Sequence, residues 1–205
     1  ATGADVREVS RAIGSDTRIG SKFLDSGPGF GGSCFKKDIL NLVYLSEYFG
    51  LPEVAKFWES VVNLNKWHQH RISKLVTKTL NGTLCNKKIV VLGFAFKSNT
   101  NDTRESAAIQ ICKDLLEEGS ILVIHDPKVD KKQIEKDLGK RPININASST
   151  VKELNADEGC WISVQDLSGI FTEADAVLIL TGWEEYKQIN WTNIAKVMRK
   201  PSWVF

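Results

Sequence analysis

The sequence predicts an α/β protein, in which a helical central domain built on one long helix is followed by a parallel-sheet domain that is truncated at its C-terminus. Two observations lead to this prediction. A helical pattern runs without a convincing stop from Pro52 to Asn81–Gly82. After it, apolar β-rich runs alternate with helical segments, which is typical of a parallel sheet covered by helices on both faces. The change of pattern near residues 82–87 divides the chain into expected domains at 1–83 and 84–205.

The first domain is expected to hold three helices. Apolar residues at helical spacing predict a helix over residues 4–13. A loop rich in Gly and Ser follows at 14–33, and Ser33 is the expected N-cap of a second helix at 34–49. The third helix begins at Pro52 and has apolar residues over most of its circumference, which indicates burial on several sides. We interpret it as a spine between domains or subunits.

The second domain is expected to alternate strands with helices. Apolar runs rich in β-branched residues predict strands, and the amphipathic stretches between them predict helices. The expected strands lie at 88–96, 121–125, 161–164, 175–181 and from 203 onward, and the expected helices at 104–118, 130–138, 165–173 and 191–199. Residues 140–160 are hydrophilic and are expected to form an irregular surface insertion.

Composition excludes several classes of protein. The chain has 205 residues, 42% of them hydrophobic and 25% charged, and a formal net charge of +2, so there is no reason to expect a nucleic-acid partner. No apolar run approaches the roughly 18 residues that a membrane span needs. Charged residues interrupt any apolar core of a signal peptide near residue 1. The four cysteines lack paired C-x-x-C spacing, so we expect reduced thiols in a cytoplasmic protein and no metal site.

Cys34 is the first candidate for chemistry. It lies after a glycine-rich loop and at the start of a predicted helix, where unpaired backbone N–H groups favour a thiolate. Lys36 and Lys37 add positive charge, and Asp38 lies one helical turn further on, where its carboxylate would orient or deprotonate a water. A thiolate is the nucleophile required for attack on an aldehyde. The alternative is that Cys34 is a small buried residue at a helix start, which is the usual role of a free cysteine.

The stretch Gly27–Gly32 matches the dinucleotide-binding pattern G-x-G-x-x-G. That pattern needs a strand before it, and the preceding residues 21–26 are short and polar. We therefore reject a dinucleotide site here and expect a flexible loop that closes over a ligand.

A second candidate site is the turn Gly93–Lys97, which ends the first expected strand of the sheet. Ligands of open α/β sheets bind at such strand ends. Lys97 would meet a phosphate as a point charge, and Phe96 would stack on a base, whereas the alternative is a core aromatic and a solvated charge. The turn has no second glycine pattern, so it does not predict a dinucleotide site, and Asp126 after the next strand is interpreted as a turn residue.

Three segments of the chain together resemble one enzyme family. They are Arg18–Leu24, Gly29–Asp38, and Gly93–Lys97 with Asn101–Ser106, and they occur in the order and at the spacing of the UDP-glucose/GDP-mannose dehydrogenase family. The stretches Ala1–Val6 and Leu51–Val54 are similar to its animal-type members that act on UDP-glucose. The resemblance covers essentially the whole chain and implies that the second domain is a Rossmann-like domain that binds the UDP-sugar.

The resemblance implies an NAD-dependent double oxidation of UDP-glucose to UDP-glucuronate. In the family, a primary alcohol of the sugar becomes an aldehyde, and a cysteine adds to the aldehyde as a thiohemiacetal. A second hydride then leaves to give a thioester, which water hydrolyses. This agrees with the chemistry of a thiolate, whose covalent adduct splits a difficult aldehyde oxidation into easier steps.

The resemblance also assigns roles to residues of this sequence. Cys34 would be the catalytic nucleophile, with Asp38 assisting water and Lys37 lying near the nicotinamide. The implied NAD contacts are Cys34, Phe35, Lys36, Lys37 and Arg104. The implied UDP-glucose contacts are Arg18, Asp25, Ser26, Gly27, Pro28, Gly29, Phe30, Gly31, Phe96 and Lys97. Arg18 would reach a sugar site in the neighbouring subunit, and Asp25 stands where the animal-type members have Lys.

The family's members are longer than this chain and are assembled from subunits. The resemblance implies a homo-oligomer, with a dimer formed through the long helix that assembles further to a hexamer. It also implies that an N-terminal NAD domain precedes this segment and that a substrate-contacting segment follows it. We therefore expect the chain to have no turnover on its own.

Three alternatives stay open. The enzyme could act on another nucleotide sugar, such as UDP-N-acetylmannosamine or GDP-mannose. The chain could be a non-catalytic module for nucleotide-sugar binding or assembly, although such a module would not need Cys34, Lys37 and Asp38 intact. Cys34 could also sense oxidants, because accessible low-pKa thiols oxidise readily, although the sequence places no resolving cysteine near it.

Overall fold

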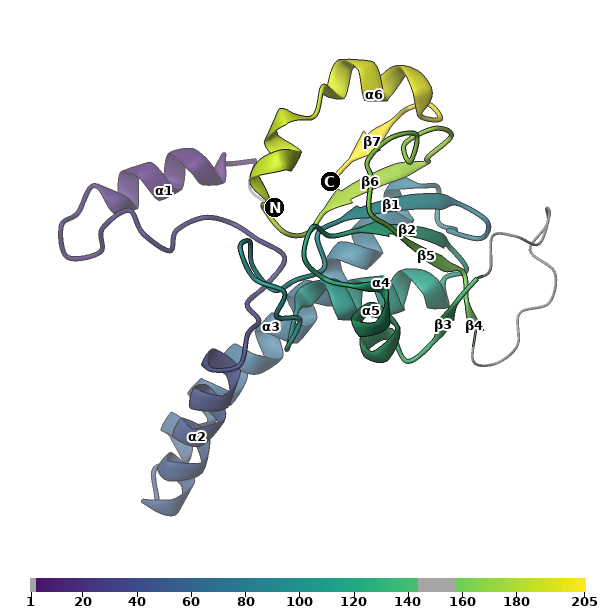
Figure 1. Cartoon of the computed structure of the whole chain (residues 1–205). Coiled ribbons are helices and arrows are strands. Elements are labelled where there is room, and N and C mark those ends of the chain that lie inside the picture. Colours follow the sequence, from purple (N-terminus) through teal and green to yellow (C-terminus); the bar gives the residue numbers. More distant parts are fainter. Residues whose placement is uncertain (1–2, 144–157) are drawn as a thin grey trace.

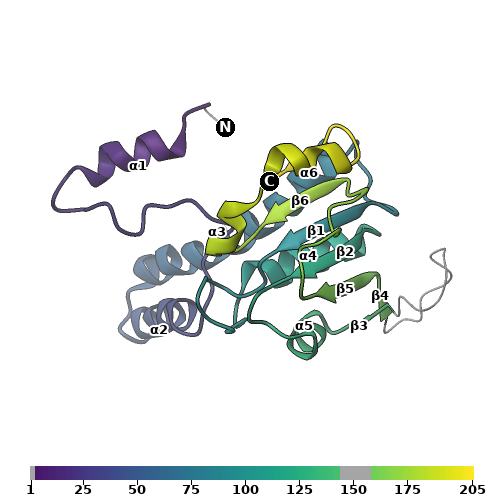
Figure 2. The same cartoon turned by 45° about the horizontal axis from the view of Figure 1, so that its top comes forward.

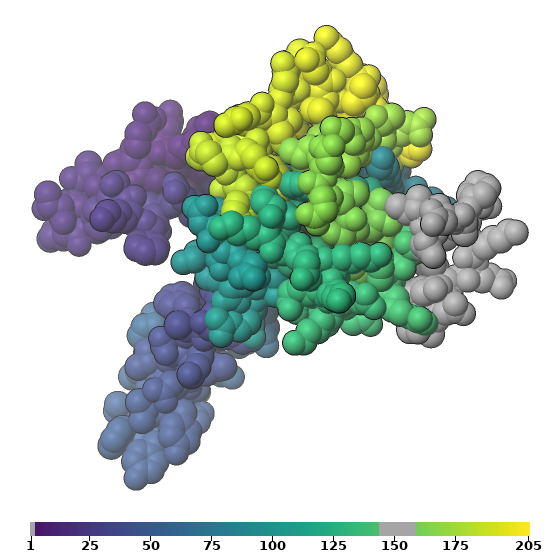
Figure 3. All heavy atoms as spheres, viewed as in Figure 1, coloured from purple at the N-terminus to yellow at the C-terminus, as the bar shows by residue number. Residues whose placement is uncertain are grey.

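The chain folds into an α/β body from which two helical segments project (Figure 1). The structure is a computed structural model and describes residues 3–143 and 158–205. Helix α1 (Val6–Gly14) lies on an arm that extends away from the body, and helices α2 (Phe35–Tyr48) and α3 (Pro52–Thr79) form a pair that projects in another direction. The space-filling view shows both projections standing clear of the body (Figure 3).

The pairing of α2 with α3 follows from the local sequence. Gly50, with a φ of +72°, follows α2 in the left-handed conformation that glycine adopts without strain. Pro52 then begins α3 at a position where its missing N–H has no helical partner to lose. Ile39, Ala55 and Val62 of the two helices are buried. Many other apolar side chains of the two helices are exposed, namely Phe35, Leu40, Leu42, Tyr44, Leu45, Tyr48, Val54, Phe57, Leu64 and Trp67. The expected burial of α3 on several sides is therefore not found within one chain.

A five-stranded, fully parallel sheet forms the body. Its strands are β1 (Lys88–Leu92), β2 (Ile121–His125), β5 (Trp161–Val164), β6 (Ala176–Ile179) and β7 (Trp203–Val204), in the order β5-β2-β1-β6-β7. Helices α4 (Ala107–Glu117) and α5 (Lys131–Leu138) cover one face, and α6 (Trp191–Val197) covers the other (Figure 2). Because both faces are covered, the central strands are continuous apolar runs.

The core of the body lies around the central strand β1. Ile89–Leu92 are fully buried, and Ile89 lies opposite Leu122 of β2 and Ala176 of β6. The end of α3 contributes to the same core through Val76 and the adjoining Leu80. The long helix is therefore anchored in the sheet domain at one end and free of it at the other.

The strand order places a topological switch point at β1. Along the chain, β2 and β5 are added on one side of β1, and β6 and β7 are added on the other. In sheets of this kind, ligands bind at the carboxyl ends of the two strands where the order reverses, which here are β1 and β6. The predicted α/β class is confirmed, and the switch point gives a place to look for the site.

The segment 165–173 is not the predicted helix. Gly169 has a φ of +72°, which interrupts any helix there. Asp166 instead accepts hydrogen bonds from the backbone N–H and the hydroxyl of Ser168, both at 3.0 Å, and these close a local turn. The 3-10 helix η1 (Glu184–Gln188) was not predicted either.

The connection after β1 begins earlier and ends later than predicted. Gly93, with a φ of +92°, turns the chain well before the predicted end of the strand at Phe96. Helix α4 does not begin at Arg104, because Ser106 takes the N-cap position and accepts a hydrogen bond from a backbone N–H of the first turn. An irregular connection therefore lies over the carboxyl end of β1.

The predicted surface insertion at 140–160 lies for the most part outside the described residues. At its two ends, β3 (Arg141–Pro142) pairs in parallel with β4 (Glu158–Gly159). Among the helices that the structure describes, none has the length and apolar character needed to cross a membrane. The described residues also contain no group of three or more His, Cys, Asp or Glu side chains arranged to hold a metal ion.

Candidate functional site

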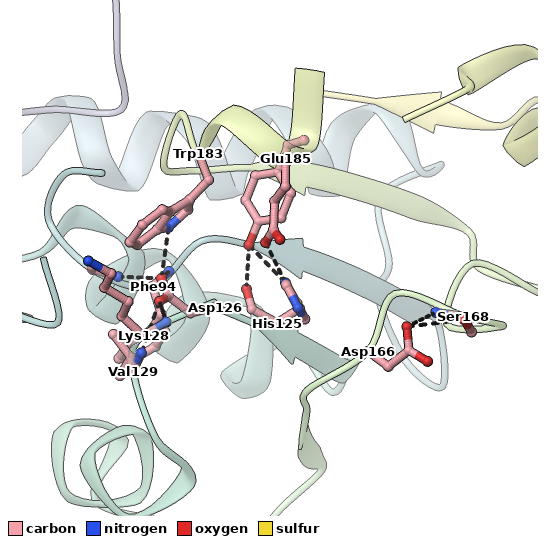
Figure 4. Close-up of polar contacts among 11 residues, drawn as sticks. Phe94, His125, Asp126, Lys128, Val129, Asp166, Ser168, Trp183 and Glu185 are labelled. Atoms are coloured by element: carbon pink, nitrogen blue, oxygen red, sulfur yellow. Dashed lines mark hydrogen bonds and ion pairs between the residues drawn. The ribbon is translucent and has the colours of Figure 1, made fainter. Parts of the chain in front are cut away.

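A buried carboxylate organises the turns at the switch point (Figure 4). Asp126 follows β2 and is 1% exposed. Its Oδ2 accepts hydrogen bonds from the backbone N–H groups of Phe94 and Ala95 at 2.7 and 3.0 Å, and from the indole N–H of Trp183 at 3.2 Å. Its Oδ1 accepts from two backbone N–H groups of the following turn at 2.9 and 3.0 Å. One side chain thereby ties together the turns after β1, β2 and β6.

Two hydroxyl groups complete the same network. Thr181, after β6, donates to the carbonyl oxygen of Ala95 at 2.6 Å, and Ser106 donates to the carbonyl oxygen of Phe94 at 2.8 Å. A Cβ atom on Gly93 would lie 2.4 Å from the Cβ of Thr181. The turns after β1 and β6 therefore touch at a point where only glycine fits.

This network decides how the turn after β1 can hold a ligand. In a dinucleotide fingerprint, the backbone approaches the pyrophosphate directly. Here Asp126 takes two of the N–H groups that follow the strand, so these two cannot contact a phosphate. Lys97 is exposed in this turn, with its Nζ 5.3 Å from the centre of the half-buried Phe96 ring. The geometry agrees with the lack of a dinucleotide pattern in this part of the sequence.

The loop before α2 is docked on the connection after β1. The backbone N–H of Gly32 donates to the carbonyl oxygen of Arg104 at 2.8 Å. A Cβ atom on Gly31 would lie 2.4 Å from the carbonyl oxygen of Glu105, and one on Gly32 would lie 2.9 Å from the ring of Phe96. Contacts this close leave no room for a side chain at either position. The glycines of this loop therefore allow two backbones to approach each other.

Cys34 is exposed at the start of α2. It occupies the N-cap position itself, so the prediction that Ser33 is the N-cap is wrong. The Ser33 hydroxyl lies 3.5 Å from the Cys34 sulfur instead, and α2 has no side-chain cap. An anion at this position meets the uncapped backbone N–H groups and the positive end of the helix dipole. Its exposure also contradicts the alternative that Cys34 is a buried packing residue.

Two cations beside Cys34 are paired with carboxylates. Arg104 contacts Asp102 at 2.7 Å. The hydrogen bonds that Arg104 donates to this carboxylate, together with the negative charge of Asp102, raise the pKa of Arg104. Lys36 forms an ion pair with Glu105 at 2.7 Å, so it serves as a second tie between α2 and the connection after β1.

The other residues on the first turn of α2 are exposed. The backbone N–H of Asp38 donates to the carbonyl oxygen of Cys34 at 2.8 Å, which places Asp38 one helical turn from the thiol, as predicted. In the part of the chain that the structure describes, the side chains of Lys37 and Asp38 make no hydrogen bond or ion pair. Phe35 packs edge-on against Phe30, with 4.7 Å between ring centres.

The predicted substrate contacts divide between two places. Residues 27–31 lie next to the body, held by α3 and by the connection after β1. Arg18 lies on the projecting arm, where its guanidinium pairs with Asp16 at 2.6 Å. Asp25 and Ser26 line a hollow of about 720 Å³ together with residues of α1. Within this chain, Arg18 and Asp25 do not join the site around Cys34.

Three residues that shape the site were not predicted, namely Asn65, Glu105 and Thr181. Their partners are distant in sequence, as shown by Thr181 and Ala95, which are 86 residues apart. No local pattern marks such pairs. An acid directly after a strand, as at Asp126, is a readable signal, but the sequence did not show that it would bind three turns.

The remaining cysteines are also free, in line with the expected reduced thiols. Cys112 and Cys160 are buried, and burial raises the pKa of both thiols. Cys85 is exposed, like Cys34, but it lies at the opposite end of β1 from the switch point, before the strand begins.

Replacing Asp126 by Asn should destabilise the body. An amide has one acceptor oxygen, so its NH₂ group would face N–H donors that now bind a carboxylate. We expect the free energy of unfolding to fall by about 1–3 kcal/mol, measured by urea denaturation of the chain. Asp130→Asn is the matched control, because Asp130 is an exposed N-cap and Asn caps helices equally well. Equal stabilities of the two variants would contradict the role of Asp126.

Gly31→Ala should loosen the loop before α2. The new methyl group would overlap the carbonyl oxygen of Glu105, whereas Gly27 has no atom within 4 Å of its Cβ position, so Gly27→Ala is the control. We expect the backbone N–H of Gly32 to exchange with solvent at least about tenfold faster in Gly31→Ala than in the control. Hydrogen–deuterium exchange measures this rate. Equal protection in both variants would show that the docking does not depend on the close approach.

The comparisons with known proteins agree on one family. The model of the "UDP-glucose/GDP-mannose dehydrogenase family, central domain" matches residues 1–67, and that of the same family's "UDP binding domain" matches residues 90–205. UDP-glucose 6-dehydrogenases of Drosophila melanogaster and Gallus gallus are 44% and 46% identical to this chain over its whole length, which is 42% and 40% of theirs.

Solved structures give the same result. A UDP-glucose dehydrogenase from the archaeon Pyrobaculum islandicum is similar with a TM-score of 0.76 and 27% identity, over 99% of this chain and 44% of that chain. A GDP-mannose dehydrogenase from Pseudomonas aeruginosa shares the fold, with a TM-score of 0.63 and 22% identity over 98% of this chain and 42% of that chain. The chain thus spans less than half the length of these relatives, and it belongs to the UDP-glucose/GDP-mannose dehydrogenase family.

Proposed function

We propose that the protein containing this chain oxidises UDP-glucose to UDP-glucuronate with NAD, through covalent catalysis at Cys34. The observation that carries this proposal is the position of Cys34. Its thiol is exposed at an uncapped helix start, and the loop before it is docked on the connection that covers the switch point of a parallel sheet. This position supports a nucleophilic role for Cys34, because such sheets bind ligands at this end. The identity of 44–46% to named UDP-glucose 6-dehydrogenases supports the substrate.

The residues of this chain fit one edge of an NAD site. Lys37 and Arg104 are exposed cations near the thiol, suited to contact a negatively charged cofactor. The turn after β1 uses N–H groups internally, so it is not the place for the cofactor's pyrophosphate. We therefore assign the main NAD contacts to the expected N-terminal domain. When bound, NAD accepts one hydride in each of the two oxidations.

Cys34 carries the covalent steps. Loss of a hydride and the hydroxyl proton converts the primary alcohol of the glucose to an aldehyde. The Cys34 sulfur then adds to the aldehyde carbon, and the oxygen takes up a proton to give a thiohemiacetal. Loss of a second hydride and of that proton leaves a thioester. Water oriented by Asp38 attacks the thioester carbon, breaks the C–S bond, supplies the second carboxylate oxygen and releases the thiol.

The nucleotide sugar lies, in this proposal, across the switch point. Phe96 offers a half-buried ring for the base, and Lys97 offers an exposed cation for a phosphate. Residues 27–31 cover the sugar, and Asp25 and Ser26 join them to the arm. Arg18 reaches the sugar site of a neighbouring copy; it lies four residues after α1, the helix on the projecting arm.

The exposed apolar side chains of α2 and α3 support assembly through the long helix. Phe57, Leu64 and Trp67 are 58–62% exposed on α3, and apolar patches of this kind mark contacts with other proteins. We propose a dimer through this surface and further assembly to a hexamer in the cytoplasm. The division of the chain at residues 83 and 84 into a helical part and a UDP-sugar-binding part belongs to the same proposal.

Calorimetric titration of the chain tests the division of ligands. We expect weak binding of UDP-glucose and no binding of NAD, because only the sugar-nucleotide contacts are concentrated in this segment. Binding of NAD alone would show that the turn after β1 has been given the wrong ligand. The chain should also produce no NADH from UDP-glucose on its own.

Cys34→Ser in the full-length protein should lower the rate of UDP-glucuronate formation by about 10³-fold or more, because a hydroxyl is a far weaker nucleophile than a thiolate. Steady-state NADH production with product analysis measures this. Cys85→Ser is the matched control, since Cys85 is also exposed and lies away from the site. Full activity in Cys34→Ser would favour a non-catalytic role for this position.

A further inference from the structure

The side of α3 that faces the glycine-rich loop carries an asparagine that binds both backbone groups of one loop residue. The backbone N–H of Phe30 donates to Oδ1 of Asn65 at 3.0 Å, and Nδ2 of Asn65 donates to the carbonyl oxygen of Phe30 at 3.0 Å. The two bonds form a closed pair, like those between neighbouring strands of a sheet. The partners are 35 residues apart, and the contact is partly buried.

The neighbouring residues show that the loop is fitted to this side chain. A Cβ atom on Gly29 would lie 2.7 Å from Oδ1 of Asn65, and the φ of Gly29 is +127°, a region that other residues rarely adopt. One helical turn along α3, Nε2 of His68 lies 3.0 Å from the carbonyl oxygen of Gly27. A carbonyl oxygen can only accept, so this Nε2 carries the proton of the bond. Helix α3 therefore holds the loop at two successive points.

The loop is held from its other end by the connection after β1. Gly31 and Gly32 are docked there, directly after the residue that Asn65 binds. The ring of Phe30 in turn packs on Phe35, which follows Cys34 in the chain. A short segment is thus fixed at both ends, and the end nearest the expected sugar depends on α3.

We propose that Asn65 is a positioning residue that sets the conformation of residues 27–31 for binding of the sugar nucleotide. The inference rests on the proposed function, in which this segment covers the substrate. Only a carboxamide of this length offers a donor and an acceptor side by side, so no other side chain reproduces the pair. Ordering the segment before the substrate arrives removes an entropic penalty from binding.

This role predicts an effect on binding with little effect on the chemical steps. Cys34 keeps its place without Asn65, because Gly32 and the ion pair between Lys36 and Glu105 still hold the start of α2. Loss of two hydrogen bonds should raise KM for UDP-glucose by about tenfold, while kcat and KM for NAD change by less than about threefold.

The experiment compares three variants of the full-length protein. Asn65→Leu removes both hydrogen bonds, and leucine keeps the helix stable. Asn65→Asp keeps the acceptor but sets an oxygen against the carbonyl of Phe30. Asn63→Asp is the control, because Asn63 is exposed on the same helix and makes no contact of this kind with any residue that the structure describes. Hydrogen–deuterium exchange of the Phe30 amide, measured on the 205-residue chain, reports the bridge independently of activity.

We expect the raised KM for UDP-glucose in both Asn65 variants, and faster exchange at Phe30 in Asn65→Leu, which loses the acceptor of that amide, with neither change in the wild type or the control. Unchanged exchange in Asn65→Leu would overturn the bridge, and faster exchange in that variant with an unchanged KM would overturn its role in binding. A fall in kcat with KM unchanged would also overturn it. A wild-type protein that does not oxidise UDP-glucose would refute the proposed function instead, and the role of Asn65 in substrate binding with it.

Discussion

The carboxylate of Asp126 is the constraint on which the rest of the site depends. A buried carboxylate is stable only when its oxygens accept hydrogen bonds, and its donors here come from the turns after β1, β2 and β6. Satisfying this one group fixes three loops that are far apart in the sequence. The connection after β1 then offers a fixed surface, with the Phe96 ring and the Glu105 carbonyl oxygen placed so that only glycines can approach. Cys34 is held at the switch point because the connection beneath its loop is itself held.

The second support of the site is α3, which belongs to both parts of the molecule. Its end is anchored in the sheet core through Val76 and Leu80, its middle holds the glycine-rich loop through Asn65 and His68, and its beginning pairs with α2. A helix is stiff over this length, so the three contacts cannot shift independently. The loop is therefore positioned by α3 and by the connection after β1, and both are fixed to the core of the sheet domain.

The elements that depend on local sequence patterns could be predicted, whereas the contacts between residues far apart in the sequence could not. The long helix and β2 lie where periodicity and the Gly50 and Pro52 signals placed them. The helix predicted at 165–173 is wrong because Asp166 and Gly169 favour a turn there. Lys36 was interpreted as added positive charge near the thiol, but Glu105, 69 residues away, pairs with it. No window of sequence contains both partners of such a contact, and the bonds of Asp126 are hidden for the same reason.

The predicted substrate residues that do not converge in one chain are informative as well. Val6, Val9 and Ile13 lie on one side of α1 and are 44–46% exposed, although a helix with such an apolar stripe normally packs against protein. Among the described residues, Arg18, on the same arm, pairs only with the nearby Asp16, and an exposed ion pair of this kind contributes little to stability. The guanidinium of Arg18 can therefore leave Asp16 for another partner with little loss of stability. The proposed sharing of the sugar site between subunits would account for both the open apolar side of the arm and the division of the predicted substrate residues between arm and body.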